Sequence, residues 1–189
     1  MLPILLIVGL IIVAFGVISA YNSLISLKNQ VLNAWKQIDV QLKRRHDLIP
    51  NLVNTVKGAM NFEKGTLEAV VAARNKAVSA TGVAATAKAE GELTQALGRL
   101  FALTEAYPDL KATGNIAQLQ EEITSTENKI GFSRQLYNDT ATAYNTKQMQ
   151  FPTNLVAGLA KASPAELWEI EDAGERAVPV VDLSNKPGA

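Results

Sequence analysis

The chain has no cysteine and a single histidine, and these two scarcities exclude several kinds of chemistry. Without cysteine there is no disulfide and no thiolate chemistry. A di-iron site in a helical bundle needs two Glu-x-x-His motifs, which His46 alone does not supply. The glycines between residues 58 and 98 are too far apart to form a phosphate-binding loop. We therefore predict no catalytic residue, no metal site, no cofactor and no enzymatic activity.

Aromatic side chains are scarce, and the chain has no excess charge of either sign. The 18 basic and 18 acidic residues give a formal net charge of zero, which argues against nucleic acid as a partner. Aromatic residues make up 6% of the chain while alanine is abundant, and this composition favours helices over a β-rich core. The sequence therefore predicts an all-α protein.

A long apolar run stands at the N-terminus. Residues 2–21, LPILLIVGLIIVAFGVISAY, carry no charged side chain, and a helix of about 20 residues spans about 30 Å, the thickness of a bilayer core. The run is longer than the apolar core of a secretory signal, and no Lys or Arg precedes it. We therefore expect an uncleaved transmembrane anchor, with a signal cleaved near Ser19-Ala20-Tyr21 as the alternative. Lys28 and Lys36 follow the run, so the positive-inside rule favours a cytoplasmic location for the rest of the chain.

Four helical patterns follow the anchor. Apolar side chains recur every three or four residues within 22–46, 48–79, 83–107 and 115–150. Short connections between them favour alternating directions, and no glycine or proline interrupts the first helix before Pro50. We predict an N-terminal transmembrane helix continuous with an antiparallel (up-down-up-down) four-helix bundle. The corresponding parts are an anchor at 1–21, a bundle at 22–151, and a short helix with an extended acidic tail at 152–189.

The motif RRHDLIPNLV, which begins at Arg44, predicts a tight reversal between the first two helices. Arg44 and Arg45 would lie in the last turn of the first helix, Asp47 would cap the second helix, and Pro50 would lie in its first turn. A sharper interpretation is that the side chains from Arg44 to Asn51 form a partner-contact patch at the tip of the bundle farthest from the membrane.

The last predicted helix carries a polar stripe beside its apolar positions. Such a stripe is either a solvated face or an amide network that fixes register, and we favour the network. If Arg134 is buried, it needs a carboxylate partner. The stripe and the two tyrosines beside it comprise Arg134, Asn138, Ala141, Asn145, Gln148, Tyr137 and Tyr144.

Phe151-Pro152 closes the last helix, which returns toward the membrane in this arrangement. The segment that follows should then lie near the bilayer, and Trp168 suits a membrane interface. Packing of this segment on the bundle or on a neighbouring copy is the equal alternative. The tail from residue 171 shows no helical period, and we expect it to be extended.

The chain resembles the LemA family of bacterial membrane proteins in RRHDLIPNLV, in VKG at 56–58, in EKGTLEAVVAARNKA at 63–77 and in SRQLYNDTATAYNTKQMQFPTNLVAGL at 133–159. The resemblance implies one transmembrane helix, a cytoplasmic helical bundle at the inner membrane and no known enzymatic activity; some relatives organise internal membranes. After Leu159 the family pattern leads us to expect Gly-Phe and further aromatics, whereas this chain has AKASPAELWEI. The positions that match the family pattern are Arg44, Arg45, Asp47, Leu48, Ile49, Pro50, Asn51, Leu52, Arg134, Tyr137, Asn138, Tyr144, Asn145, Phe151, Pro152 and Asn154.

Two functional hypotheses follow. The first is a scaffold that sits in the lipid bilayer through residues 2–21 and self-associates as a homo-oligomer. Gly9 and Gly16 are seven residues apart on one face of the span, which lets helices approach closely. The second is an adaptor or regulatory subunit that presents the RRHDLIPN tip to a membrane enzyme such as a metallopeptidase.

Overall fold

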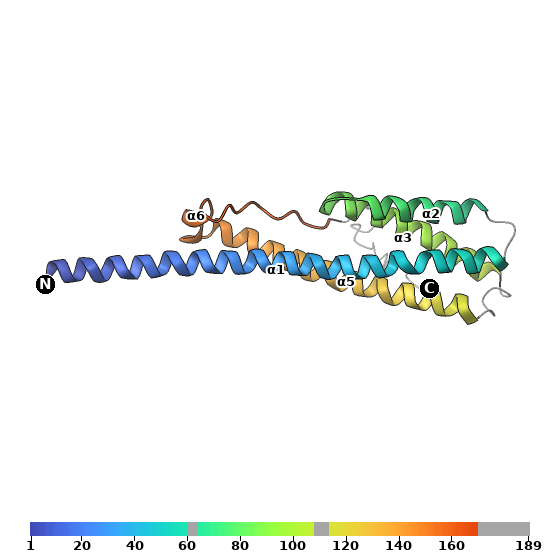
Figure 1. The fold of residues 1–189 in the computed structure, drawn as a ribbon, viewed down its shortest axis with the longest axis horizontal. Helices are drawn as coiled ribbons and strands as arrows, with labels where there is room; N and C mark the ends of the chain where they lie inside the picture. The colour runs from blue at the N-terminus through green and yellow to red at the C-terminus, as the bar shows by residue number, and fades with distance from the viewer. Residues whose placement is uncertain (60–63, 108–113, 170–189) are drawn as a thin grey trace, which may run out of the picture.

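The structure is a computed structural model that describes residues 1–59, 64–107 and 114–169. Within these ranges the chain is mostly helical and contains no β-strand, and residues 157–169 follow the last helix without regular structure. Figure 1 shows α1 along the whole length of the molecule, with α2, α3 and α5 alternating in direction beside its C-terminal part. The predicted all-α fold with an up-down-up-down bundle is confirmed. The elements are α1 (Leu2–Ala59), α2 (Lys64–Ser79), α3 (Val83–Ala106), α5 (Gly114–Met149) and α6 (Thr153–Val156).

The first third of α1 projects beyond the bundle (Figure 1). Its side chains are exposed up to Ser19, and packing begins at Ala20 and Leu24. Among the described residues, α1 is the one helix that is long and apolar enough to cross a membrane, and none of its apolar window is buried. The predicted continuity between the apolar run and the first helix of the bundle is confirmed.

The core has two sections along the length of the bundle. In the section farther from the apolar run, all four long helices meet around residues such as Leu52, Leu93 and Ile123. In the nearer section, α1 and α5 pack against each other around Ile38 and Tyr137, and the chain after α6 covers them together with the start of α3. The buried positions follow the three- and four-residue spacing that the sequence predicted.

The predicted reversal at RRHDLIPNLV is wrong, because α1 continues through this motif to Ala59. Asp47 and Pro50 therefore lie inside a helix, and residues 48–59 of the predicted second helix belong to α1. Proline inside a helix removes the N–H that would bond to the carbonyl four residues earlier, at a cost of about 3 kcal/mol or more. Here that carbonyl belongs to His46, and Arg74 Nε of α2 donates a hydrogen bond to it at 3.3 Å. A contact from a neighbouring helix thus replaces the missing donor.

The chain after α5 turns back along the bundle. α6 lies at the point where the free part of α1 gives way to the packed part, and residues 157–169 run from there toward the start of α3 (Figure 1). Trp168 is buried, and its ring centroid lies 6.0 Å from that of Trp35. Packing on the bundle is therefore the correct alternative for Trp168, and a place at the membrane interface is wrong. The predicted extended tail, from residue 171, lies outside the described residues.

Candidate functional site

Four charged or titratable side chains meet between the two core sections; we call Arg45, His46, Glu90 and Glu127 the ion-pair centre. Arg45 is 1% exposed, and its guanidinium donates to the carboxylates of Glu90 on α3 and Glu127 on α5. His46 Nε2 lies 2.7 Å from Glu90 Oε1. The centre therefore links α1, α3 and α5 through charge-assisted hydrogen bonds.

The protonation states in the centre follow from burial and mutual pairing. Burial lowers the pKa of Arg45, while the Glu90 carboxylate beside it acts in the opposite direction. Burial raises the pKa of Glu90, but the hydrogen bond with His46 and the charge of Arg45 outweigh it, so that pKa lies below its ordinary value. Because an arginine side chain stays protonated in proteins, the centre holds a charged guanidinium facing the charged Glu90 carboxylate. Removing one member of such a buried set leaves an uncompensated charge.

The ion-pair centre corrects the predicted tip patch. Arg45 lies inside the bundle, whereas Arg44 and Asn51 are exposed on the side of α1 and Asp47 pairs with Lys43 at 3.0 Å. The motif therefore stands in the middle of a helix and not at a tip. Sequence reasoning also missed Glu90.

A signal for the centre was present in the spacing of the chain. Arg45 follows Leu42 by three residues and precedes Ile49 by four, which places it on the apolar seam of α1. Glu90 likewise precedes Leu93 by three residues on the seam of α3. A charge on an apolar seam predicts a buried pair, since such residues are almost never fully buried without a partner.

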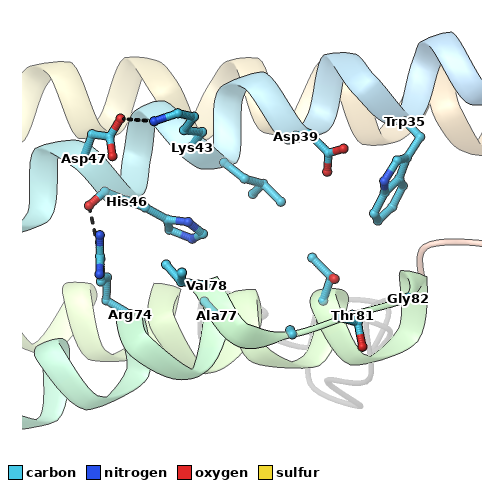
Figure 2. Close-up of a pocket in the computed structure, with 13 residues that line it drawn as sticks. Trp35, Asp39, Lys43, His46, Asp47, Arg74, Ala77, Val78, Thr81 and Gly82 are labelled. Atoms are coloured by element: carbon cyan, nitrogen blue, oxygen red, sulfur yellow. Dashed lines mark hydrogen bonds and ion pairs between the residues drawn. The ribbon is translucent and has the colours of Figure 1, made fainter.

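A cleft of about 470 Å³ opens between α1 and the turn from α2 to α3 (Figure 2). Its charged lining comes from Asp39, Lys43 and Asp47 on α1 and from Arg74 on α2. Burial raises the pKa of Asp39. Across the described ranges, no group of three His, Cys, Asp or Glu side chains is placed to hold a metal ion.

The polar stripe of α5 forms an amide clamp, by which we mean Asn138 and Asn145 with the backbone that they hold. Asn138 Nδ2 donates to the Trp168 carbonyl at 2.9 Å, and the Trp168 N–H donates to Asn138 Oδ1 at 2.8 Å. Asn145 makes the same pair of bonds with Ala165, at 2.8 and 2.7 Å. Each amide thus satisfies both backbone groups of one residue, as a neighbouring β-strand would.

The spacing of the amide clamp follows from the geometry of its two partners. Seven residues of helix between the asparagines rise about 10.5 Å, at about 1.5 Å per residue. Three residues of extended chain, from Ala165 to Trp168, span about 10 Å at about 3.3 Å per residue. The match lets two amides on one helix face hold a straight segment. The predicted amide network is present, and its partner is the returning chain.

Aromatic and cationic side chains complete the clamp. The Tyr137 hydroxyl donates to the Glu166 carbonyl at 2.7 Å, and burial raises the pKa of that tyrosine. The Arg134 guanidinium is half-buried and lies 5.7 Å from the centroid of the Trp168 ring, a cation–π arrangement. Tyr144 is buried beneath the returning chain, and Pro152 directly precedes α6. The predicted site residues of α5 therefore dock the C-terminal segment on the bundle.

Comparison with known proteins agrees with the sequence motifs. The model of the LemA family matches residues 34–183. Protein LemA of Metamycoplasma hominis is 32% identical over 145 residues, which cover 76% of this chain and 66% of that protein. Magnetosome protein MamQ 2 and Magnetosome protein MamQ 1 of Paramagnetospirillum magneticum are each 23% identical over 181 residues, covering 82% of this chain and 66% of each relative. The chain thus spans just under two thirds of the length of these relatives. Because the family model covers most of its length, the chain belongs to the LemA family.

Proposed function

We propose that this protein is a non-enzymatic, single-pass membrane protein whose bundle acts as a self-associating scaffold at the bacterial inner membrane, with the bundle in the cytoplasm. The observation that carries the proposal is the continuity of α1. One helix provides both an exposed apolar span and the central element of the bundle. A core helix of a soluble protein is mostly buried, whereas none of the apolar window of α1 is.

The ion-pair centre supports the non-enzymatic part of the proposal. Perturbed pKa values mark either active sites or structural ion pairs. Here the two groups that pair most closely, Arg45 and Glu90, are buried and form an ion pair with each other. Their contacts hold three helices together, and this structural role accounts for their pKa shifts without a reaction.

Exposed apolar side chains on the bundle support self-association. Leu32 and Val40 are exposed on one face of α1, and Phe132 and Leu136 are exposed on α5. The rings of Trp35 on α1 and Tyr137 on α5 are in contact, with their centroids 5.4 Å apart. This contact sets the register of the two antiparallel helices. In that register Val40 stands level with Phe132. Zero net charge does not oppose crowding of copies that are tethered to one membrane.

The test is the mass of the full-length protein after extraction in detergent and reconstitution into nanodiscs. We expect an oligomer for the natural chain and a shift toward the monomer for Val40→Asp with Phe132→Asp. Thr142→Asp is the matched control because it adds one charge at an exposed position of α5, and its mass should stay that of the natural chain. A natural chain that is monomeric in both media contradicts self-association.

An adaptor function is the second candidate, and it rests on a narrower observation. Arg44, Asp47 and Asn51 are exposed on one side of α1, at spacings of three and four residues. Recovery of membrane-protein partners with Arg44→Ala and Asn51→Ala should fall, whereas Arg99→Ala on α3 should leave it unchanged. Arg45 is left intact because its loss would destabilise the bundle. Equal recovery with all variants removes the basis for an adaptor.

A further inference from the structure

We propose that the bundle makes a second contact with lipid, through a surface that we call the membrane foot: Phe151, Leu155 and Leu159. This inference rests on the proposed anchor, because the anchor places the foot at the bilayer. The contact partner is the surface of an anionic bilayer.

The three side chains of the foot are large, apolar and mostly exposed. Their exposed fractions are 79% for Phe151, 67% for Leu155 and 76% for Leu159. Single exposed apolar side chains are common on protein surfaces, but three within nine residues form a cluster that marks an interaction site.

The opposite side of the same segment is docked on the bundle. Thr153, Val156 and Ala160 are buried between the exposed positions. Helix-like hydrogen bonds hold the segment in shape, including Ala160 N–H to the Val156 carbonyl at 3.1 Å and the Asn154 N–H to the Gln150 carbonyl at 2.9 Å. A spacing of four residues in such a conformation puts Leu155 and Leu159 on one outward face, and Phe151 is exposed just before α6. The segment is therefore amphipathic, with its apolar outer face held rigidly.

The position of the segment identifies what covers this face. α6 contacts α1 and lies where the free part of α1 gives way to the packed part (Figure 1). Ala20, the second-last residue of the apolar run, is already buried there. If residues 2–21 span the hydrocarbon core, the foot stands at the level of the headgroups. This holds for every copy, including a monomer, so lipid covers the foot before a second copy does.

The charge around the foot suits anionic headgroups. From Lys147 to Ser163 the chain carries two lysines and no acidic residue. Lys161 is exposed directly after the foot, and lysines beside an interfacial apolar face extend their ammonium groups toward the headgroups. An anchor and a foot together fix the rotation and tilt of the bundle on the membrane, whereas a single spanning helix alone would leave the bundle free to rotate about the helix axis.

The test uses the absence of natural cysteine, so that a single introduced cysteine reports one position. The full-length protein is labelled with an environment-sensitive fluorophore at Leu155→Cys and reconstituted into vesicles of phosphatidylethanolamine and phosphatidylglycerol. Vesicles with spin-labelled lipids then quench any label in contact with the bilayer. Phe15→Cys reports the anchor, and Val71→Cys, an exposed apolar position of α2, is the matched control.

We expect the labels at Phe15 and Leu155 to be quenched several-fold more than the label at Val71. At Leu155, a spin label near the headgroup should quench more strongly than one deep in the chain. Quenching at Phe15 together with a Leu155 signal equal to that of Val71 overturns the foot and leaves the anchor standing. Absence of quenching at both Phe15 and Leu155 overturns the anchor and the foot together. A Leu155 label that lipid does not quench, but that is shielded from iodide as the protein density rises, assigns the surface to a second copy and overturns the proposal.

Discussion

The hydrogen bond from Arg74 to the His46 carbonyl explains how Pro50 is accommodated inside α1, and it predicts an energetic coupling between two distant positions. Replacing Pro50 with alanine supplies the missing N–H, which then bonds to the His46 carbonyl within the helix. In that background the carbonyl no longer depends on Arg74 Nε, which donates to it at 3.3 Å in the natural chain.

The magnitude follows from the change in hydrogen bonding. A bond that involves a charged group contributes about 1.5–3 kcal/mol, and since Arg74 is half-buried we expect Arg74→Met to cost about 1–2 kcal/mol in the natural chain. Pro50→Ala removes a helix penalty of about 3 kcal/mol that the Arg74 contact already offsets in part. The substitution also makes the unfolded chain more flexible, which lowers the free energy of unfolding by about 0.4–1 kcal/mol. A net gain of about 0–1.5 kcal/mol remains.

The assay is a double-mutant cycle on the full-length protein in detergent, with urea unfolding followed by circular dichroism. Arg74→Met should cost about 1 kcal/mol less in the Pro50→Ala background than in the natural chain, as coupling between contacting groups requires. Lys76→Met, on the exposed side of α2, is the control and should show no coupling to Pro50. Equal costs of Arg74→Met in both backgrounds would refute the compensation.

Three further predictions concern the ion-pair centre and the amide clamp. Arg45→Met should lower the free energy of unfolding by about 3–5 kcal/mol because it removes the arginine that pairs with the buried Glu90 carboxylate, whereas Arg44→Met should change it by less than about 0.5 kcal/mol; urea melts measure both. Asn145→Ala should loosen the returning chain by about 1–3 kcal/mol, since it removes two hydrogen bonds, and tryptophan fluorescence should shift to longer wavelength, which Gln135→Ala should not cause. The pKa of Glu90 lies below its ordinary value of 4.5, so its contribution is complete well above pH 4.5 and is lost as the pH falls through the folded pKa. In Glu90→Gln, the free energy of unfolding should therefore fall less steeply as the pH is lowered through the acid range. A pH dependence equal to that of the natural chain would contradict the pairing.

Regular spacing made most of the core predictable. Positions such as Ile38, Leu93 and Ile130 follow one helical face, and burial of that face requires only the periodicity of the helix. The prediction from sequence failed at Pro50, where local propensity predicts the start of a helix. The donor that permits a continuous helix comes from Arg74, which is distant in sequence, and a local rule does not contain it.

The candidate site shows a similar division. Asn138 and Asn145 were identifiable as a network because they recur on one face of α5. Their partner was not identifiable, because the amides bind backbone groups of residues 165–168, and a backbone interaction leaves no side-chain pattern. Arg45 was misplaced for another reason: the predicted reversal put it in the last turn of a helix, where a cation complements the helix dipole.

The central claim is that one uninterrupted helix passes from lipid into the bundle, and a distance between two spin labels tests it most directly. Leu10→Cys lies in the apolar run and Lys36→Cys on the exposed side of the packed part. Twenty-six residues of helix at about 1.5 Å each separate their backbones by about 39 Å. In vesicles, with labelled protein diluted in unlabelled protein, we predict a narrow distribution centred near that distance of about 39 Å and a label at Leu10 that contacts lipid. A broad or much shorter distribution, or a label at Leu10 that is open to water, would contradict the account.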